Sequence, residues 1–261
     1  YQVRGPRELG CRFEAETPHY RVMTDISAEA AKRYGEILEA GWRRYTAGFR
    51  TDFVRPNARK PRVSIFYTAE NYYTYFDILS SVRGEHTLGV FRQELNEMVF
   101  FETPDRTDTI QTMLHEAFHH YMSLLCVDTP PYWYNEGMAE YMSAVEVEGD
   151  AITARGRLLE GRLVPLQAAL QSDYLIPFPR IMTEAPSEFY SGAVSLKYSQ
   201  AWSMIHFFHE YEKGKYRPAI DAYLAALRSG KSTQEAFDLT FKADAERMEG
   251  EWKKWAKTLK P

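Results

Sequence analysis

Two histidines and a glutamate form the segment His-Glu-Ala-Phe-His, in which His115 and His119 flank Glu116. Residues four apart share one face of an α-helix, so both imidazoles can reach one metal ion, and the glutamate can serve as a general base. We expect a helix from about Arg106 to Cys126, with His120 pointing away from the metal face as a structural residue. A buried, hydrogen-bonded histidine pair without metal is the alternative. The apolar stripe that would bury this helix consists of Leu114, Phe118, Tyr121, Met122 and Leu125.

A catalytic zinc site generally has three protein ligands and one open position. Glu136 is the candidate third ligand, because a helix over Trp133 to Val145 could fold back and bring its carboxylate to the histidine face. The small Gly137 and Ala139 permit close approach between helices. Glu140 lies one turn later and could accept a hydrogen bond from the second ring nitrogen of a ligand histidine. For both glutamates, an ordinary helix carboxylate is the alternative.

Together these motifs resemble the gluzincin superfamily of zinc metallopeptidases, in particular the small bacterial peptidase-MA-like proteins and their secreted relatives. The resemblance is specific over 115–141, where the HExxH motif is followed by Trp133 to Tyr141, which is similar to a WLxEGxAEY-type segment. It extends less specifically over 19–255. It implies that His115, His119 and Glu136 hold Zn²⁺ and that Glu116 is the base and proton shuttle.

A tyrosine that stabilises the oxyanion is also implied by the resemblance. The segment that starts at Tyr198 is similar to the YxxGA-like segment of gluzincin aminopeptidases, so Tyr198 is the candidate and Tyr190 the second choice. Two departures from the pattern are Ala201, in the place of the glycine neighbourhood, and Lys197 before the tyrosine. The chain has 18 tyrosines, so a structural role for Tyr198 is an equal alternative. No GxMEN motif is present, which leaves exopeptidase and endopeptidase action both open.

The implied activity is hydrolysis of peptide bonds in a peptide or protein substrate. In similar enzymes an extended substrate pairs with an edge strand, which here would be Leu88 to Arg92 or Met98 to Glu102. A plain hairpin in the core sheet is an equal alternative for these two segments. Two other functions stay open. One is a gluzincin-like scaffold that is catalytically inactive and serves as a binding or structural module, and the other is a hydrolase of a non-peptide amide.

The elements that must position these residues favour an α+β, gluzincin-like fold. We expect a single catalytic domain over 1–261, with an α/β part at 1–105 and a helical part at 106–261 that carries the metal site. Predicted strands are His19 to Thr24, Arg62 to Tyr67, and a hairpin of the two segments above. Ser27 is the expected N-cap of a helix that runs to about Phe49, Thr68 that of a helix over about Glu70 to Leu79, and Asp105 or Thr107 that of the histidine helix. Four more predicted helices cover 196–212, 217–228, 232–241 and 244–259. The prolines at 165, 177, 179 and 186 favour an irregular segment over 146–195.

Composition is ordinary for a globular protein, with 44% hydrophobic and 26% charged residues and a net charge of −4. Lysines and arginines are spread along the chain, so no nucleic-acid partner is expected, and no apolar run approaches the ~20 residues of a membrane helix. The chain begins at Tyr1 without a Met, which suggests a processed protein. Together with this, the resemblance to bacterial and secreted proteins implies a secreted, periplasmic or cell-envelope location and a bacterial origin. Cys11 and Cys126 are either one disulfide or two buried thiols. The sequence does not indicate an oligomeric state.

Overall fold

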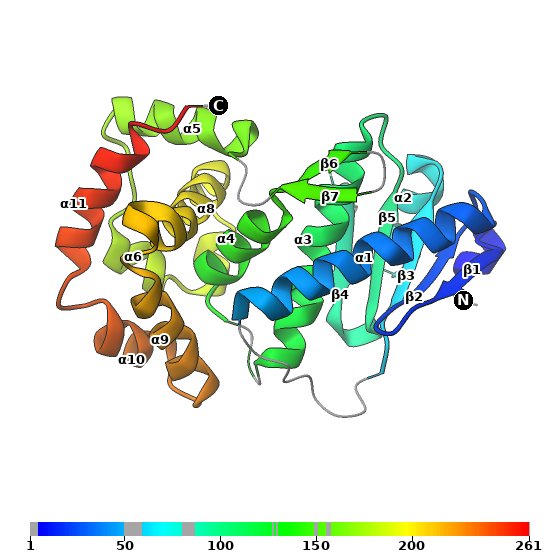
Figure 1. Ribbon diagram of the computed structural model, residues 1–261, viewed down its shortest axis with the longest axis horizontal. Coiled ribbons are helices and arrows are strands. Elements are labelled where there is room, and N and C mark those ends of the chain that lie inside the picture. The colour runs from blue at the N-terminus through cyan, green and yellow to red at the C-terminus, as the bar shows by residue number, and fades with distance from the viewer. Residues whose placement is uncertain are drawn as a thin grey trace. The chain divides into compact units, whose positions relative to one another are not determined.

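A computed structural model describes residues 5–49, 59–79, 87–126, 128, 130–148, 151–154 and 158–260. The chain divides into two compact units (Figure 1). The sheet unit comprises Tyr1–Leu124 and Val145–Arg155, and the helical unit comprises Leu125–Ala144 and Gly156–Pro261. That the two form one catalytic domain stays a prediction.

The sheet unit is built on a mixed five-stranded sheet, which confirms the α+β class. Its strands lie in the order β1-β2-β3-β5-β4, where β2, β3 and β5 are parallel and β1 and β4 are antiparallel to their neighbours. β4 is therefore an edge strand and β5 an interior one, which distinguishes the two halves of the predicted hairpin. The strand bounds are β1 Phe13–Glu16, β2 Arg21–Thr24, β3 Arg62–Phe66, β4 Gly89–Arg92 and β5 Glu97–Phe101, with a further small hairpin of β6 Glu146–Glu148 and β7 Ala151–Ala154.

Three helices pack in the sheet unit, and their predicted starts are confirmed by side-chain caps. Ser27 Oγ accepts the N–H of Ala30 at 3.0 Å, and Thr68 Oγ1 accepts the N–H of Asn71 at 3.2 Å. At the third helix the cap is Asp105, whose Oδ1 accepts the N–H of Thr107. The helices are α1 Ala28–Phe49, α2 Ala69–Leu79 and α3 Arg106–Leu125, preceded by the 3-10 turn η1 Pro6–Leu9. No helix in the described ranges is both long and apolar enough to span a bilayer.

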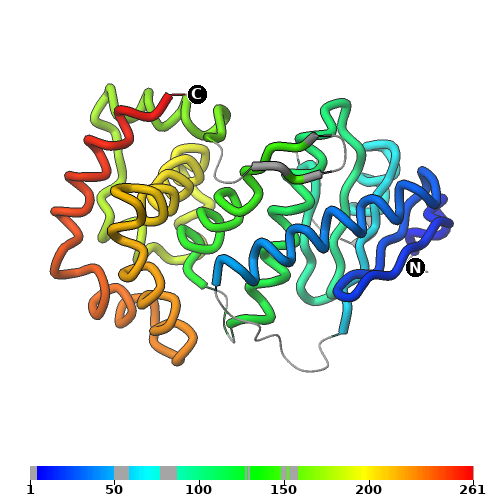
Figure 2. The backbone as a smooth tube through the Cα atoms, viewed as in Figure 1, coloured from blue at the N-terminus to red at the C-terminus, as the bar shows by residue number. Residues whose placement is uncertain are grey.

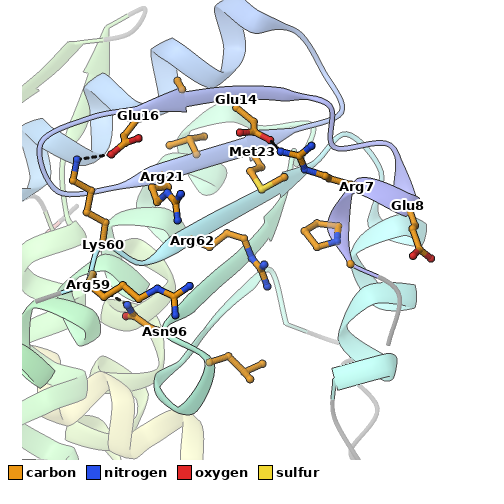
Figure 3. Close-up of a pocket in the computed structure, with 15 residues that line it drawn as sticks. Arg7, Glu8, Glu14, Glu16, Arg21, Met23, Arg59, Lys60, Arg62 and Asn96 are labelled. Atoms are coloured by element: carbon orange, nitrogen blue, oxygen red, sulfur yellow. Dashed lines mark hydrogen bonds and ion pairs between the residues drawn. The ribbon is translucent and has the colours of Figure 1, made fainter. Parts of the chain in front are cut away.

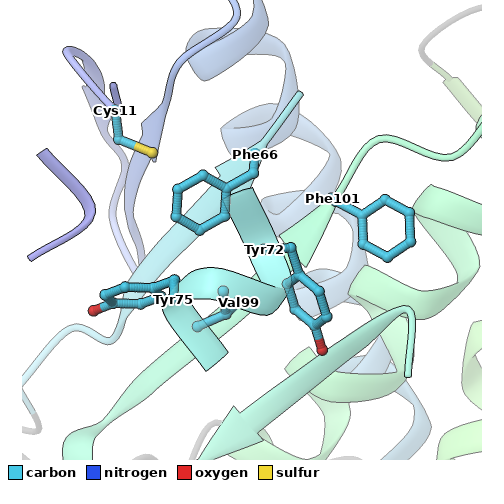
Figure 4. Close-up of a cluster of buried hydrophobic side chains, with 6 residues drawn as sticks. All are labelled: Cys11, Phe66, Tyr72, Tyr75, Val99 and Phe101. Atoms are coloured by element: carbon cyan, nitrogen blue, oxygen red, sulfur yellow. The ribbon is translucent and has the colours of Figure 1, made fainter. Parts of the chain in front are cut away.

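Aromatic side chains fill the core between α2 and the sheet. Figure 4 shows Tyr72 and Tyr75 of α2 beside Phe66, Val99 and Phe101 of the strands, with the thiol of Cys11 nearby. Burial raises the pKa of Cys11 to about 12 and that of Cys126 to about 11. Both thiols are buried and free, as the second of the two alternatives predicts.

In the helical unit, α8 lies at the centre and contacts α4, α5, α9 and α11 (Figure 2). The long helices predicted from the sequence are confirmed within a few residues at each end. The segment expected to be irregular instead contains three helices. Pro177, Pro179 and Pro186 stand at or just before the starts of two of them, where a missing N–H costs nothing, whereas Pro165 lies inside the third. The bounds are α4 Tyr132–Ser143, α5 Glu160–Gln171, α6 Phe178–Thr183, α7 Pro186–Phe189, α8 Val194–Glu210, η3 Tyr211–Lys213, α9 Arg217–Arg228, α10 Thr233–Thr240 and α11 Ala245–Ala256.

Candidate metal-binding site

The apolar stripe of α3 fixes the helix that carries the two histidines. All five residues predicted for the stripe are buried. Much of their packing is against α1, where the Tyr45 hydroxyl donates to the carbonyl of Leu114 at 2.6 Å and a Cβ on Gly41 would meet the Leu114 side chain at 2.5 Å. The residue directly before His115 is thus held by both a hydrogen bond and a close helix contact. This packing sets which face of α3 stays outside the core.

On that face, His115 and His119 bring their Nε2 atoms to 3.1 Å from one another. Zn–N bonds of about 2.0–2.1 Å at the tetrahedral angle would place two nitrogens about 3.3 Å apart. The two imidazoles are only partly buried, and their planes cross at 81°. The pair therefore fits two positions of one tetrahedral ion. A single shared proton between neutral rings, the metal-free alternative, has the same spacing.

Glu116, between the histidines, contacts the edge strand. The backbone N–H of Phe91 in β4 donates to Glu116 Oε2 at 2.8 Å. This N–H is directed at Glu116 and so takes no part in the ladder between β4 and β5. The carboxylate is held at the outer side of the edge strand, where it can accept a proton from a water molecule.

His120 lies in the core of the sheet unit, as expected for a structural residue. It is buried beside Trp42, Tyr20 and Phe91, with ring centroids 5.5–6.4 Å away. Burial, with a smaller contribution from His19, lowers the pKa of His120 to about 4. The neutral imidazole is therefore the form that the core accommodates at neutral pH.

In the helical unit, α4 carries Glu136 and Glu140 within a nearly fully buried helix. Glu136 is 4% exposed, and its Oε1 accepts a hydrogen bond from the hydroxyl of Tyr190 at 2.8 Å. The small Gly137 makes its close contact with α8, because a Cβ there would lie 2.6 Å from the carbonyl oxygen of Ala201. The Tyr190 hydroxyl thus fixes the orientation of a buried carboxylate that could serve as an oxygen ligand.

Both tyrosine candidates lie near this carboxylate, but in different ways. Tyr190 donates to Glu136 directly, whereas Tyr198 contacts Tyr190 and lies beneath the guanidinium of Arg162, 5.0 Å from its ring centre. Burial, followed by the charge of Glu136, raises the pKa of Tyr190 far above its ordinary value. Tyr190 is thus a hydroxyl donor throughout the working pH range.

Two cations near these residues were not predicted from the sequence. Arg162 of α5 forms an ion pair with Glu140, the candidate partner of a ligand histidine. Lys197 is buried and pairs with Glu184 at 2.6 Å, and it also donates to the carbonyl of Glu188, so it ties α8 to the segment before Tyr190. These contacts join residues 22, 13 and 9 positions apart. No local pattern indicates them.

The predicted site residues thus fall into two sets. His115, Glu116 and His119 lie together in the sheet unit, and Glu136, Glu140, Tyr190 and Tyr198 lie together in the helical unit. That the two sets converge on one ion stays a prediction. In the comparisons with known proteins, no family model matches the chain, and no curated protein matches it.

Proposed function

We propose that this protein is a zinc-dependent hydrolase that cleaves peptide bonds, with His115, His119 and Glu136 as the metal ligands. The observation that carries the proposal is the 3.1 Å spacing of the two imidazole nitrogens, with Glu116 held between them on the same helix. Each of the three ligands offers one atom of a kind that zinc binds, and together they could hold a metal ion. A second support is the hydroxyl of Tyr190, which orients the Glu136 carboxylate.

A bound zinc ion would supply an activated water and polarise the scissile carbonyl. The protein's own residues perform the remaining steps. Glu116 takes the proton from the attacking water and passes it to the departing amine. The hydroxyl of Tyr198 donates a hydrogen bond to the oxyanion that develops, because the single proton of the Tyr190 hydroxyl is already donated to Glu136. The outer side of β4 offers backbone groups to an extended peptide, beside the carboxylate of Glu116.

Metal analysis and a peptide-cleavage assay test the proposal together. We expect one zinc per chain in the wild type and in Glu116→Gln, because this glutamate is not a ligand. Cleavage of a broad peptide library should fall by about a hundredfold to ten-thousandfold in Glu116→Gln, since general-base catalysis is lost. The matched control is Glu36→Gln, which removes an exposed carboxylate on α1 and should leave both properties unchanged.

The outcomes separate the three functions. A zinc-loaded wild type that cuts no peptide would contradict the peptidase proposal, and the inactive binding module would then be favoured. If the same protein hydrolyses a panel of non-peptide amides in a Glu116-dependent manner, the chemistry holds and the substrate class changes. If the wild-type protein does not bind zinc stoichiometrically, the proposed metal site itself is contradicted.

A further inference from the structure

A second candidate site lies in the sheet unit, on residues that play no part in the proposed metal site. It is a pocket of about 810 Å³ between η1, strands β1 to β3, and the turn before β5 (Figure 3). Small-molecule sites commonly have volumes of ~300–1,000 Å³. The pocket is therefore large enough for a small organic ligand.

Positive charge dominates the lining of this pocket, although the chain as a whole carries a net charge of −4. Five cationic side chains line it against three carboxylates, and a fourth carboxylate, Glu97, pairs with Arg62 from behind the lining, which leaves a surplus of one positive charge. Arg7 pairs with Glu14 and Lys60 with Glu16, and Arg21 and Arg62 lie between these two pairs in Figure 3. The excess charge is thus concentrated on the arginines in the middle of the pocket.

The strand register explains why these arginines meet. Arg21 of β2 is directly opposite Arg62 of β3, and directly opposite residues of neighbouring strands project from the same face of the sheet. Like charges in such positions repel one another. Of these two arginines, Arg62 is the one with a counter-charge, because the fully buried Glu97 accepts hydrogen bonds from its Nε and Nη2 at 2.7 and 2.8 Å.

Arg21 and Arg59 add guanidinium groups that are not committed elsewhere. Within the described part of the chain, neither side chain makes an ion pair or a hydrogen bond, and both line the pocket. Arg62 is fixed from behind and is still 44% exposed at its side chain. Three guanidinium groups can therefore present N–H donors to one bound group, one of them rigidly oriented.

We propose that this pocket binds a small molecule through an anionic phosphate or carboxylate group, held by Arg21, Arg59 and Arg62. Planar guanidinium groups donate paired hydrogen bonds that match the oxygens of both anions. The bound anion would also relieve the repulsion between Arg21 and Arg62. Met23 and Leu95 in the lining provide apolar surface for the remainder of the ligand.

Calorimetric titration with inorganic phosphate and, separately, with succinate tests this proposal. Sodium chloride at equal ionic strength is the reference, because general screening must be excluded. We expect saturable binding of one probe molecule per chain, and the stronger probe tells which oxyanion the site prefers. Arg21→Gln and Arg59→Gln should each weaken it about tenfold or more, since a charge-assisted hydrogen bond is lost.

The control variant is Arg12→Gln, which removes an exposed arginine of the same unit that does not line the pocket. It should bind the probes like the wild type, and circular dichroism should show all three variants folded. Absence of saturable binding for both probes, or an equal loss in Arg12→Gln, would overturn the proposal. Zinc content and peptide cleavage do not enter this test, so its result is independent of the proposed hydrolase.

Discussion

The hydroxyl of Tyr190 is directed at a candidate metal ligand. The hydroxyl of Tyr190 donates to Glu136, while Lys197 anchors the segment that leads to Tyr190. The hydrogen bond leaves Glu136 oriented, and partners of this kind typically change metal affinity by about 10–100-fold. Tyr198 contacts Tyr190 and the guanidinium of Arg162.

We therefore expect Tyr190→Phe to lower zinc affinity about tenfold, because it deletes the hydroxyl that orients the ligand. Competition with a zinc-chelating dye measures the change. Tyr174→Phe is the control, since it removes the hydroxyl of an exposed tyrosine in the same unit and should bind zinc like the wild type. An equal loss of affinity in Tyr174→Phe and Tyr190→Phe would contradict the orienting role of the Tyr190 hydroxyl.

His209 predicts a pH dependence of stability. Its ring stacks on Tyr141, and burial, then the charges of Arg217 and His206, lower its pKa to about 4. The unfolded chain, with an ordinary histidine pKa of about 6.5, binds the proton first as the pH falls. The stability due to neutral His209 is thus fully present above about pH 6.5 and is lost as the pH falls towards 4.

Urea unfolding at about pH 7.5 and about pH 5 measures this effect. The wild type should lose about 2 kcal/mol of unfolding free energy through His209 between these two values. In His209→Gln the loss of unfolding free energy between the two pH values should be smaller than in the wild type by about 2 kcal/mol, because glutamine does not titrate. An unchanged pH dependence in the variant would mean that His209 is already free to bind a proton in the folded protein.

At the scale of elements, α4 is placed by its contact with α8. Gly137 is the point of closest approach, where an added Cβ would lie 2.6 Å from a backbone oxygen and 2.8 Å from Ile205. Gly137→Ala should therefore lower the unfolding free energy by about 1–3 kcal/mol, since the two helices must move apart. Gly250→Ala on α11 is the control, because nothing lies within 4 Å of its added Cβ and a small gain of about 0.5–1 kcal/mol is expected. Urea unfolding of both variants shows whether the change in Gly137→Ala comes from the helix contact or from the reduced backbone flexibility that both substitutions share.

The elements found from the sequence are those whose signals are local. The starts of α1, α2 and α3 could be predicted because Ser27, Thr68 and Asp105 accept backbone N–H groups within three residues. β1 was missed because its four residues are mostly exposed and gain strand structure by pairing with β2. α6 and α7 were missed because their prolines were interpreted as interruptions. At the site, the histidine pair follows from helix spacing, whereas the partners of Glu136 and Glu140 depend on tertiary packing.

At the scale of the whole molecule, the proposed zinc ion takes its ligands from both compact units. The chain passes between the units after Leu124, Ala144 and Arg155, so three connections already join them. A shared ion would couple their unfolding in addition, because it binds only when both units are folded. Ligand binding to the folded state stabilises by about 4 kcal/mol at a thousandfold excess over Kd.

Calorimetric melting with and without a chelator tests that coupling. We expect one transition for the zinc-loaded protein and, after chelation, a lower melting temperature with separate transitions for the two units. Glu136→Gln should behave like the chelated wild type, because the histidines alone tie zinc to the sheet unit only. If added zinc merges the transitions of Glu136→Gln as well, the metal is held without this carboxylate. The third ligand would then have to be sought elsewhere, while the histidine pair would still bind the ion.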